Sequence, residues 1–123
     1  ALQLAILHKH SGIATFDQDV FINVVGGIKV SETASDLVVM LAIVSSLRDK
    51  VIPSNWIAFG EVGLTGEVRP VYNAQERLSE AQKQGFELAI IPKGNTPKKS
   101  IKGMKIVSVG YLFQAIQYLL ENS

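Results

Sequence analysis

Residues 19–47, DVFINVVGGIKVSETASDLVVMLAIVSSL, decide the fold that this sequence predicts. Residues 19–25 are rich in β-branched and aromatic side chains, which suit a packed strand. Two glycines then break that pattern, because glycine permits backbone angles that other residues avoid. Residues 37–44 are eight consecutive apolar residues, typical of a helix that is covered on every side. The stretch therefore predicts a central strand followed by a buried helix.

The polar elbow between this strand and this helix has two interpretations. Ser31, Thr33, Ser35 and Asp36 carry oxygens that can accept the free amide hydrogens at the start of a helix. A serine at the start of a buried helix can also be a nucleophile. That alternative requires a base, and a lysine serving as one must lose its proton near neutral pH.

The rest of the chain alternates between helical and strand patterns. A capping box is expected at Asn73 and Glu76, and Gly85 is expected to end the helix that follows. Alternation of this kind predicts a single α/β (α+β) domain, residues 1–123, with packed helices on a mixed sheet. The predicted helices are 1–10, 37–47, 73–85 and 111–120, and the predicted strands are 13–16, 19–25, 56–62, 64–71, 88–91 and 105–109.

Composition excludes several classes of protein. The chain has 123 residues, a net charge of +1 and no cysteine, which rules out a disulfide framework and a thiolate zinc site. The apolar run at 37–44 is far shorter than the roughly 20 residues that span a bilayer, so no membrane partner is expected. His8 and His10 point to different sides of a helix, which is a poor arrangement for a metal site. Glycines at 60, 63 and 66 lack the lysine-serine pair of a phosphate loop and are interpreted as turns.

Basic residues are concentrated in one segment, residues 93–105, called here the lysine loop. The chain has no aspartate or glutamate between Leu88 and Leu120, so the charge of this segment is not balanced locally. Clustered lysines attract phosphate backbones without reading sequence, and the alternative is a solvated loop. The candidate DNA contacts are Lys93, Lys98, Lys99, Lys102 and Lys105, with Arg48 and Lys50 as further contacts.

Two long blocks, DVFINVVGGIKVSETASDL and FGEVGLTGEVRPVYNAQERL, resemble the proteolytic domain of Lon. They are more similar to the Lon-like C-terminal domain of the bacterial RadA (Sms) recombination and repair family. The stretches SSLRD and IIPKGN followed by TPKKS extend that resemblance along nearly the whole chain. The resemblance implies a Lon proteolytic-domain-like fold.

Lon proteases use a serine–lysine dyad, and the resemblance implies that both positions are degenerate here. The position of the serine matches Ala34 when the buried helix is aligned and Ser35 when the strand is aligned. The position of the lysine matches Gln75, and glutamine cannot act as a base. No catalytic residue is therefore expected, and the domain is expected not to be an enzyme.

The family resemblance also implies a role and its partners. The expected function is a non-catalytic module of a DNA repair and recombination ATPase, serving hexameric ring assembly and sequence-independent DNA binding during branch migration. The chain is expected to be a C-terminal fragment of a cytoplasmic, bacterial protein. ATP, Mg and Zn are expected to bind only in absent N-terminal domains, with no cofactor or metal in this one. The alternatives are a residual serine peptidase using Ser35 and an oligomerisation scaffold without DNA contact.

Overall fold

The computed structural model describes residues 33–122, and the predicted helix 1–10 and strands 13–16 and 19–25 lie outside them. The described residues form three α-helices, a three-stranded parallel sheet and a short antiparallel ribbon of two strands. This arrangement confirms the predicted α/β class. The elements in order are η1 (Thr33–Ser35), α3 (Asp36–Arg48), β1 (Trp56–Ala58), β2 (Glu61–Val62), β3 (Val68–Arg69), α4 (Ala74–Lys83), β4 (Leu88–Pro92), η2 (Lys93–Asn95), β5 (Lys105–Val109) and α5 (Leu112–Asn122).

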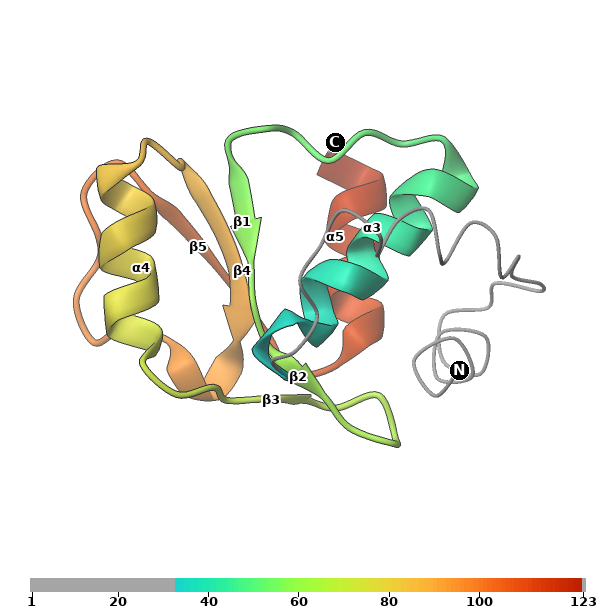
Figure 1. Cartoon of the computed structure of the whole chain (residues 1–123), viewed down its shortest axis with the longest axis horizontal. Helices are drawn as coiled ribbons and strands as arrows, with labels where there is room; N and C mark the ends of the chain where they lie inside the picture. The colour runs from blue at the N-terminus through green and yellow to red at the C-terminus, as the bar shows by residue number, and fades with distance from the viewer. Residues whose placement is uncertain (1–32, 123) are drawn as a thin grey trace.

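The main sheet has the order β1-β4-β5, and both pairings are parallel. Its central strand, β4, is buried along all five residues, as expected for a parallel strand covered on both faces. Figure 1 shows α4 on one face of this sheet and α3 with α5 on the other. The described part is thus a three-layer sandwich, with the antiparallel ribbon β2-β3 at one end.

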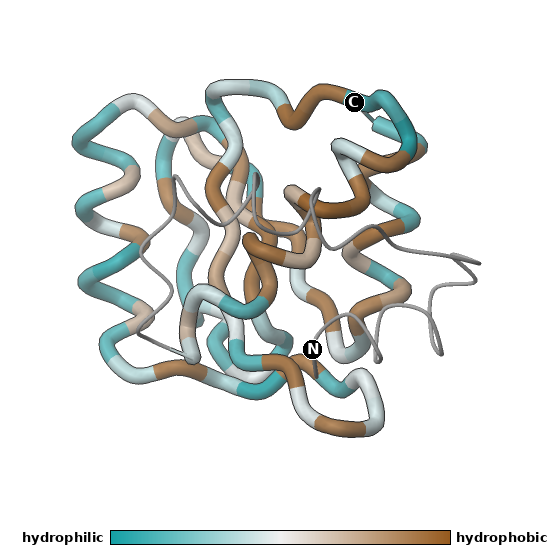
Figure 2. The backbone as a smooth tube through the Cα atoms, turned by 45° about the vertical axis from the view of Figure 1, so that its right-hand side comes forward, coloured by the Kyte–Doolittle hydropathy of each residue, from teal (hydrophilic) through white to brown (hydrophobic). Residues whose placement is uncertain are grey.

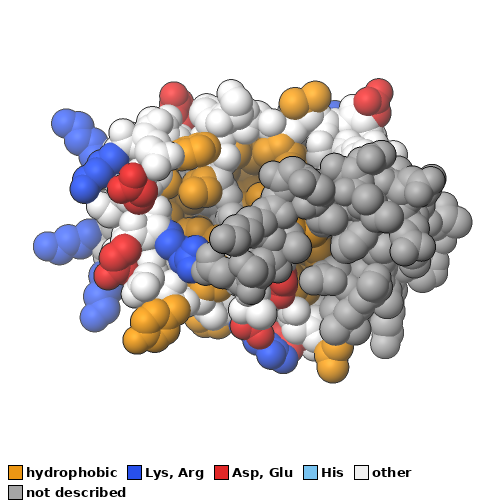
Figure 3. All heavy atoms as spheres, viewed as in Figure 1, with side chains coloured by type: hydrophobic (Ala, Val, Ile, Leu, Met, Phe, Trp, Pro, Cys, Tyr) orange, Lys and Arg blue, Asp and Glu red, His pale blue; other side chains and the backbone are white. Residues whose placement is uncertain are grey.

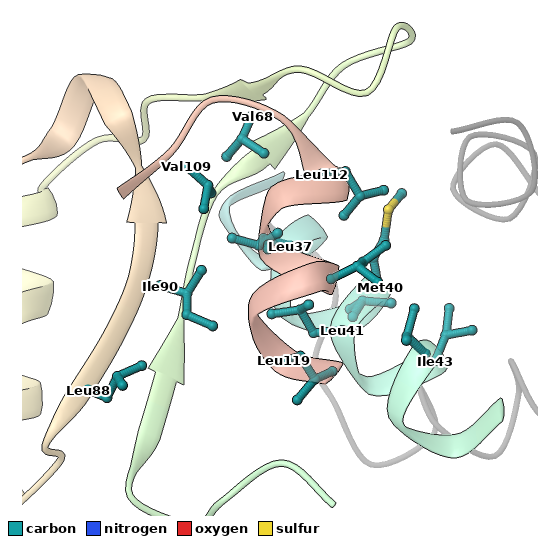
Figure 4. Close-up of a cluster of buried hydrophobic side chains, with 14 residues drawn as sticks. Leu37, Met40, Leu41, Ile43, Val68, Leu88, Ile90, Val109, Leu112 and Leu119 are labelled. Atoms are coloured by element: carbon teal, nitrogen blue, oxygen red, sulfur yellow. The ribbon is translucent and has the colours of Figure 1, made fainter. Parts of the chain in front are cut away.

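Alternate residues of β4 divide the hydrophobic interior into two cores. Leu88 and Ile90 pack in the core with α3 and α5, whereas Ala89 and Ile91 pack in the core with α4. Successive strand side chains point to opposite faces, so one short strand serves both cores. Figure 2 shows the hydrophobic colouring concentrated in the strands and the facing helices, with α4 mostly hydrophilic. Figure 4 shows the larger core between the sheet and helices α3 and α5.

Helix α3 is the buried helix that the apolar run predicted. Six of its residues are buried, and Asp49 ends it in the left-handed conformation. The predicted serine cap is wrong, because Ser35 occupies the N-cap position without a side-chain hydrogen bond to the helix. Instead the Leu37 amide donates to the Gly60 carbonyl at 3.0 Å, and an Asp36 carboxylate oxygen accepts from the Val62 amide at 3.1 Å. The helix start is therefore satisfied from the segment that contains Gly60 and β2.

The predicted strand 56–62 is divided between two sheets. β1 ends at Ala58, and β2 begins at Glu61 in the antiparallel ribbon. Between them the Phe59 amide still donates to the Ile90 carbonyl of β4 at 3.2 Å, whereas the Gly60 amide donates to the Ala34 carbonyl at 2.9 Å, so the backbone leaves the sheet at Gly60. The predicted strand 64–71 is likewise shorter, because only Val68–Arg69 forms a strand, after a turn at Gly66 with φ of 82° and a single antiparallel bridge between Glu67 and Tyr111.

The two ends of α4 differ in how well they match the sequence pattern. The predicted capping box is wrong, because Asn73 lies in the left-handed conformation and its side chain makes no cap hydrogen bond. The predicted end at Gly85 is confirmed by its φ of 91° and by a hydrogen bond from the Phe86 amide to the Ala81 carbonyl. In α5, Leu112, Ile116 and Leu119 are buried in the core with α3, whereas Leu120 is only partly buried.

The β2-β3 ribbon carries a small network of charges on its exposed side. Arg69 bridges Glu67 at 2.8 Å and Glu61 at 3.4 Å. The Thr65 hydroxyl donates to Glu67, and this bond, followed by the one from Arg69, lowers the pKa of Glu67 to about 2. The same carboxylate raises the pKa of Arg69.

Glu67 is expected to make the stability of the fold depend on pH at the acid end. Because its pKa is lower in the folded chain, its contribution is fully present above the ordinary value of 4.5 and is lost as pH falls towards about 2. The difference in urea midpoint between wild type and Glu67→Gln should therefore shrink as the pH falls across this window. The difference should be modest, because the ion pair of Glu67 with Arg69 is exposed. A difference that stays constant from pH 4.5 to about 2 would contradict the assignment.

Candidate nucleic-acid interface

A groove of about 720 Å³ lies between the start of α4 and the segment that follows β4. Residues 72–76 form one wall and residues 94–99 form the other; together they are called here the α4 groove. Its volume is within the range of about 300–1,000 Å³ that is usual for small-ligand sites. Its charged lining residues are Glu76, Lys98 and Lys99, so the groove is mixed in charge with a positive excess.

Asn95 fixes the two walls of the α4 groove to one another. Its side-chain oxygen accepts from the Val71 amide at 2.8 Å, and its side-chain nitrogen donates to the Val71 carbonyl at 3.3 Å. Gly94 packs closely on the same segment, because a Cβ at this position would lie 2.6 Å from Pro70 Cγ. The groove is therefore a preformed feature of the fold, held by paired backbone groups that would otherwise be unsatisfied.

Two further contacts hold the lysine loop against the body of the domain. The Thr96 hydroxyl lies 2.6 Å from the Ser108 hydroxyl on β5 and donates to the Lys93 carbonyl at 2.7 Å. At the other end of the loop, Gln82 of α4 donates to the Lys102 carbonyl at 2.7 Å. Both ends of the loop thus have defined positions beside α4.

The structure brings together some of the predicted DNA contacts and separates others. Lys98 and Lys99 line the α4 groove, and Lys93 and Lys102 are exposed on the same loop. Figure 3 shows lysine and arginine side chains gathered at the left edge, where Figure 1 places α4 and the loop. Lys105 lies apart from them, with its ammonium 5.7 Å from the centre of the Tyr118 ring.

Arg48 and Lys50 lie on the other side of the sheet. Both are exposed at the end of α3, which Figure 1 places on the face opposite α4. Seven predicted contacts therefore do not form a single surface, and the α4 groove with the exposed lysines of the loop is the basic surface that the geometry supports.

The two positions that resemble the Lon dyad line different hollows. Ala34 and Ser35 line a second cavity of about 470 Å³, together with Asn73, Glu76 and Arg77. Gln75 instead lines the α4 groove. Among the described residues that line the second cavity, none is a lysine or a histidine.

Sequence reasoning missed two residues of the α4 groove. Tyr72 lines it and is 85% exposed, although no aromatic pattern in the sequence singles it out. Asn95 gave no signal either, because its role depends on a segment 24 residues earlier.

In the part of the chain that the structure describes, no three metal-ligating side chains come together and no helix is long and apolar enough to cross a membrane.

The fold and this surface define an α/β domain with a basic groove at the edge of its helical layer. A family model described as "Subunit ChlI of Mg-chelatase" matches residues 3–95, and the chain belongs to that family. The chain is also similar to proteins named DNA repair protein RadA. It is 57% identical to the one from Pseudomonas aeruginosa over 121 residues, 98% of this chain and 27% of that protein.

Similarity to proteins of this name extends over distant bacteria. The chain is 56% identical to the one from Escherichia coli over 116 residues, 94% of this chain and 25% of that protein. It is 34% identical to the one from Mycobacterium tuberculosis over 121 residues, 98% of this chain and 25% of that protein. The chain thus spans about a quarter of the length of these curated relatives.

Proposed function

We propose that this domain is a non-catalytic, Lon-like module of a RadA-type DNA repair and recombination ATPase. In this proposal it helps to assemble a hexameric ring and binds DNA without reading its sequence during branch migration. The α4 groove is the observation that supports DNA binding. Lys98 and Lys99 line this groove, and further exposed lysines lie on the lysine loop, which is hydrogen-bonded to the body of the domain. Positive charge held at fixed positions on a surface is what phosphate backbones require.

The residue types at the dyad positions support the non-catalytic half of the proposal. A serine nucleophile needs a base within hydrogen-bond reach, and Gln75, which lies at the position of the Lon lysine, cannot accept a proton. Arginine stays protonated, so Arg77 cannot accept the serine proton. A serine-directed covalent probe tests this, and labelling that disappears in Ser35→Ala would overturn it.

Lys98→Ala/Lys99→Ala is expected to weaken DNA binding by the intact protein and to flatten its salt dependence. Each phosphate contact contributes about 1 to the slope of log K against log salt, so the double variant should lower the slope by about 2. The effect should be the same for unrelated base sequences, because phosphate contacts carry no sequence information. Fluorescence anisotropy with labelled DNA at two salt concentrations measures both quantities.

Arg48→Ala/Lys50→Ala is the matched control, since it removes the same charge from the end of α3 on the opposite face. We expect it to affect the salt slope less than the loop variant does. Equal effects would mean that general charge rather than the α4 groove attracts DNA. Binding that is insensitive to salt, or absent in an assembled ring, would refute the DNA contact and leave the scaffold alternative, which sedimentation of the same sample would test.

A further inference from the structure

Tyr72 has an unusual position for a large aromatic side chain. It is 85% exposed, more than any other large hydrophobic side chain described, and it lines the same groove as Lys98 and Lys99. A ring on a basic surface offers a flat face on which a nucleobase can stack, while the lysines hold the neighbouring phosphates. The groove therefore combines the two chemical features that binding of a single strand requires.

The backbone on both sides of Tyr72 is held in place by hydrogen bonds. Its carbonyl accepts from Arg77 Nε at 3.0 Å, and Asn73 next to it is locked in the left-handed conformation. On the other side, Val71 is paired with Asn95 by two hydrogen bonds. A backbone that is fixed before binding loses less conformational freedom when the base arrives, so that chiefly the exposed ring of Tyr72 has to be ordered.

We propose that the α4 groove binds single-stranded DNA, with one base stacked on Tyr72 and the flanking phosphates on Lys98 and Lys99. This inference rests on the proposed DNA-binding function and adds the class of DNA and the residue that selects it. In a duplex the bases are stacked on one another and their faces are hidden, so Tyr72 can stack only on an unpaired base. The groove should consequently prefer single strands to duplexes.

Tyr72→Ala in the intact protein is expected to weaken binding of a fluorescent oligothymidylate of about 16 nucleotides by about 5- to 100-fold. Binding of a duplex of the same length should change by less than about 3-fold, because phosphate contacts remain. Tyr72→Phe keeps the ring and should bind the single strand nearly as wild type does. Tyr111→Ala is the matched control, since Tyr111 is an exposed tyrosine that does not line the groove.

A local readout separates this site from DNA contacts elsewhere in the intact protein. An oligothymidylate carrying 5-iododeoxyuridine cross-links under ultraviolet light to aromatic rings that contact the base. We expect the cross-linked peptide to contain Tyr72 in wild type, and this measurement does not require any variant to fold. A cross-link map that omits Tyr72 would overturn the proposal.

The experiments distinguish DNA binding by the protein from base stacking on Tyr72. If Tyr72→Ala binds oligothymidylate as wild type does while Lys98→Ala/Lys99→Ala does not, stacking is refuted and the DNA-binding function stands. If Tyr72→Ala weakens duplex and single strand equally, stacking on an unpaired base is refuted as well. If the intact protein binds neither DNA, the proposed function fails and the inference fails with it.

Discussion

Leu37→Ala is expected to lower the free energy of unfolding of this chain by about 2–5 kcal/mol, the range for leucine truncation in a packed core. Leu37 is completely buried at the start of α3, and it belongs to the core that joins α3, α5 and β4. Figure 4 shows it among side chains from the sheet and from α5. Its amide also bonds to the Gly60 carbonyl, so its backbone is held in place and the cavity cannot readily collapse.

Urea unfolding followed by circular dichroism measures this loss, provided that the slope with denaturant is unchanged. Leu64→Ala is the matched control, because the same truncation is made at a leucine that is 64% exposed in the turn of the β2-β3 ribbon. The control should change the stability by less than about 0.5 kcal/mol. Similar losses at the two positions would contradict the placement of Leu37 in the core.

Gly60→Ala is expected to cost about 1–3 kcal/mol, although it adds a single methyl group. A Cβ at this position would lie 2.9 Å from Val68 Cγ1 and 3.3 Å from Pro92 Cγ, both closer than a methyl group tolerates. The backbone cannot move away easily, because Gly60 is hydrogen-bonded through its amide to Ala34 and through its carbonyl to Leu37. The loss should therefore come from steric overlap at a fixed position, added to the strain of a side chain at a φ of 155°.

A double-mutant cycle with Val68→Ala tests that cause. Truncating Val68 removes the atom nearest to the new methyl group, so Gly60→Ala should cost less in the Val68→Ala background than in wild type. Gly110→Ala is the control, since its nearest contact, with Gln114 Oε1, would be an ordinary one at 3.7 Å. If the two single costs simply add, overlap with Val68 is not the reason for the loss.

Most of the secondary structure could be predicted from local patterns. The apolar run 37–44 became α3, the apolar stretch 88–91 became the buried β4, and Gly85 ended α4 as expected. These signals are strong because burial on all sides and the left-handed conformation each require particular residue types at particular positions. The division of segment 56–62 was missed, because a β-rich run does not reveal which partner its backbone will meet.

The candidate site could be predicted only in part. Lysine clustering at 93–105 was visible as composition, and the structure places Lys98 and Lys99 in the α4 groove. Whether Arg48 and Lys50 would join them depended on which face of the sheet α3 covers, and they lie on the opposite one. Tyr72 was missed because its importance comes from neighbours that are distant in the chain.

The caps show why local rules were insufficient at the helix starts. Ser35 and Asn73 have side chains suited to capping, yet neither makes a cap hydrogen bond. The start of α3 is satisfied by the Gly60 carbonyl, and the stretch before α4 is paired with Asn95 through Val71. At α3 a tertiary partner that already satisfies the Leu37 amide removes the need for a local cap, whereas at α4 the pairing of Val71 fixes the chain that leads into the helix.

The sequence by itself determined most of the helices and strands in the described part, that the class of the protein is α/β, and where its lysines concentrate. Those properties follow from residue type and spacing within a few neighbours along the chain. Only the tertiary structure decided which faces meet, which lysines share a surface, and that Tyr72 stands beside them. Such juxtapositions depend on packing between segments far apart in sequence, as in β4, whose alternate residues belong to the two cores on opposite faces of the sheet.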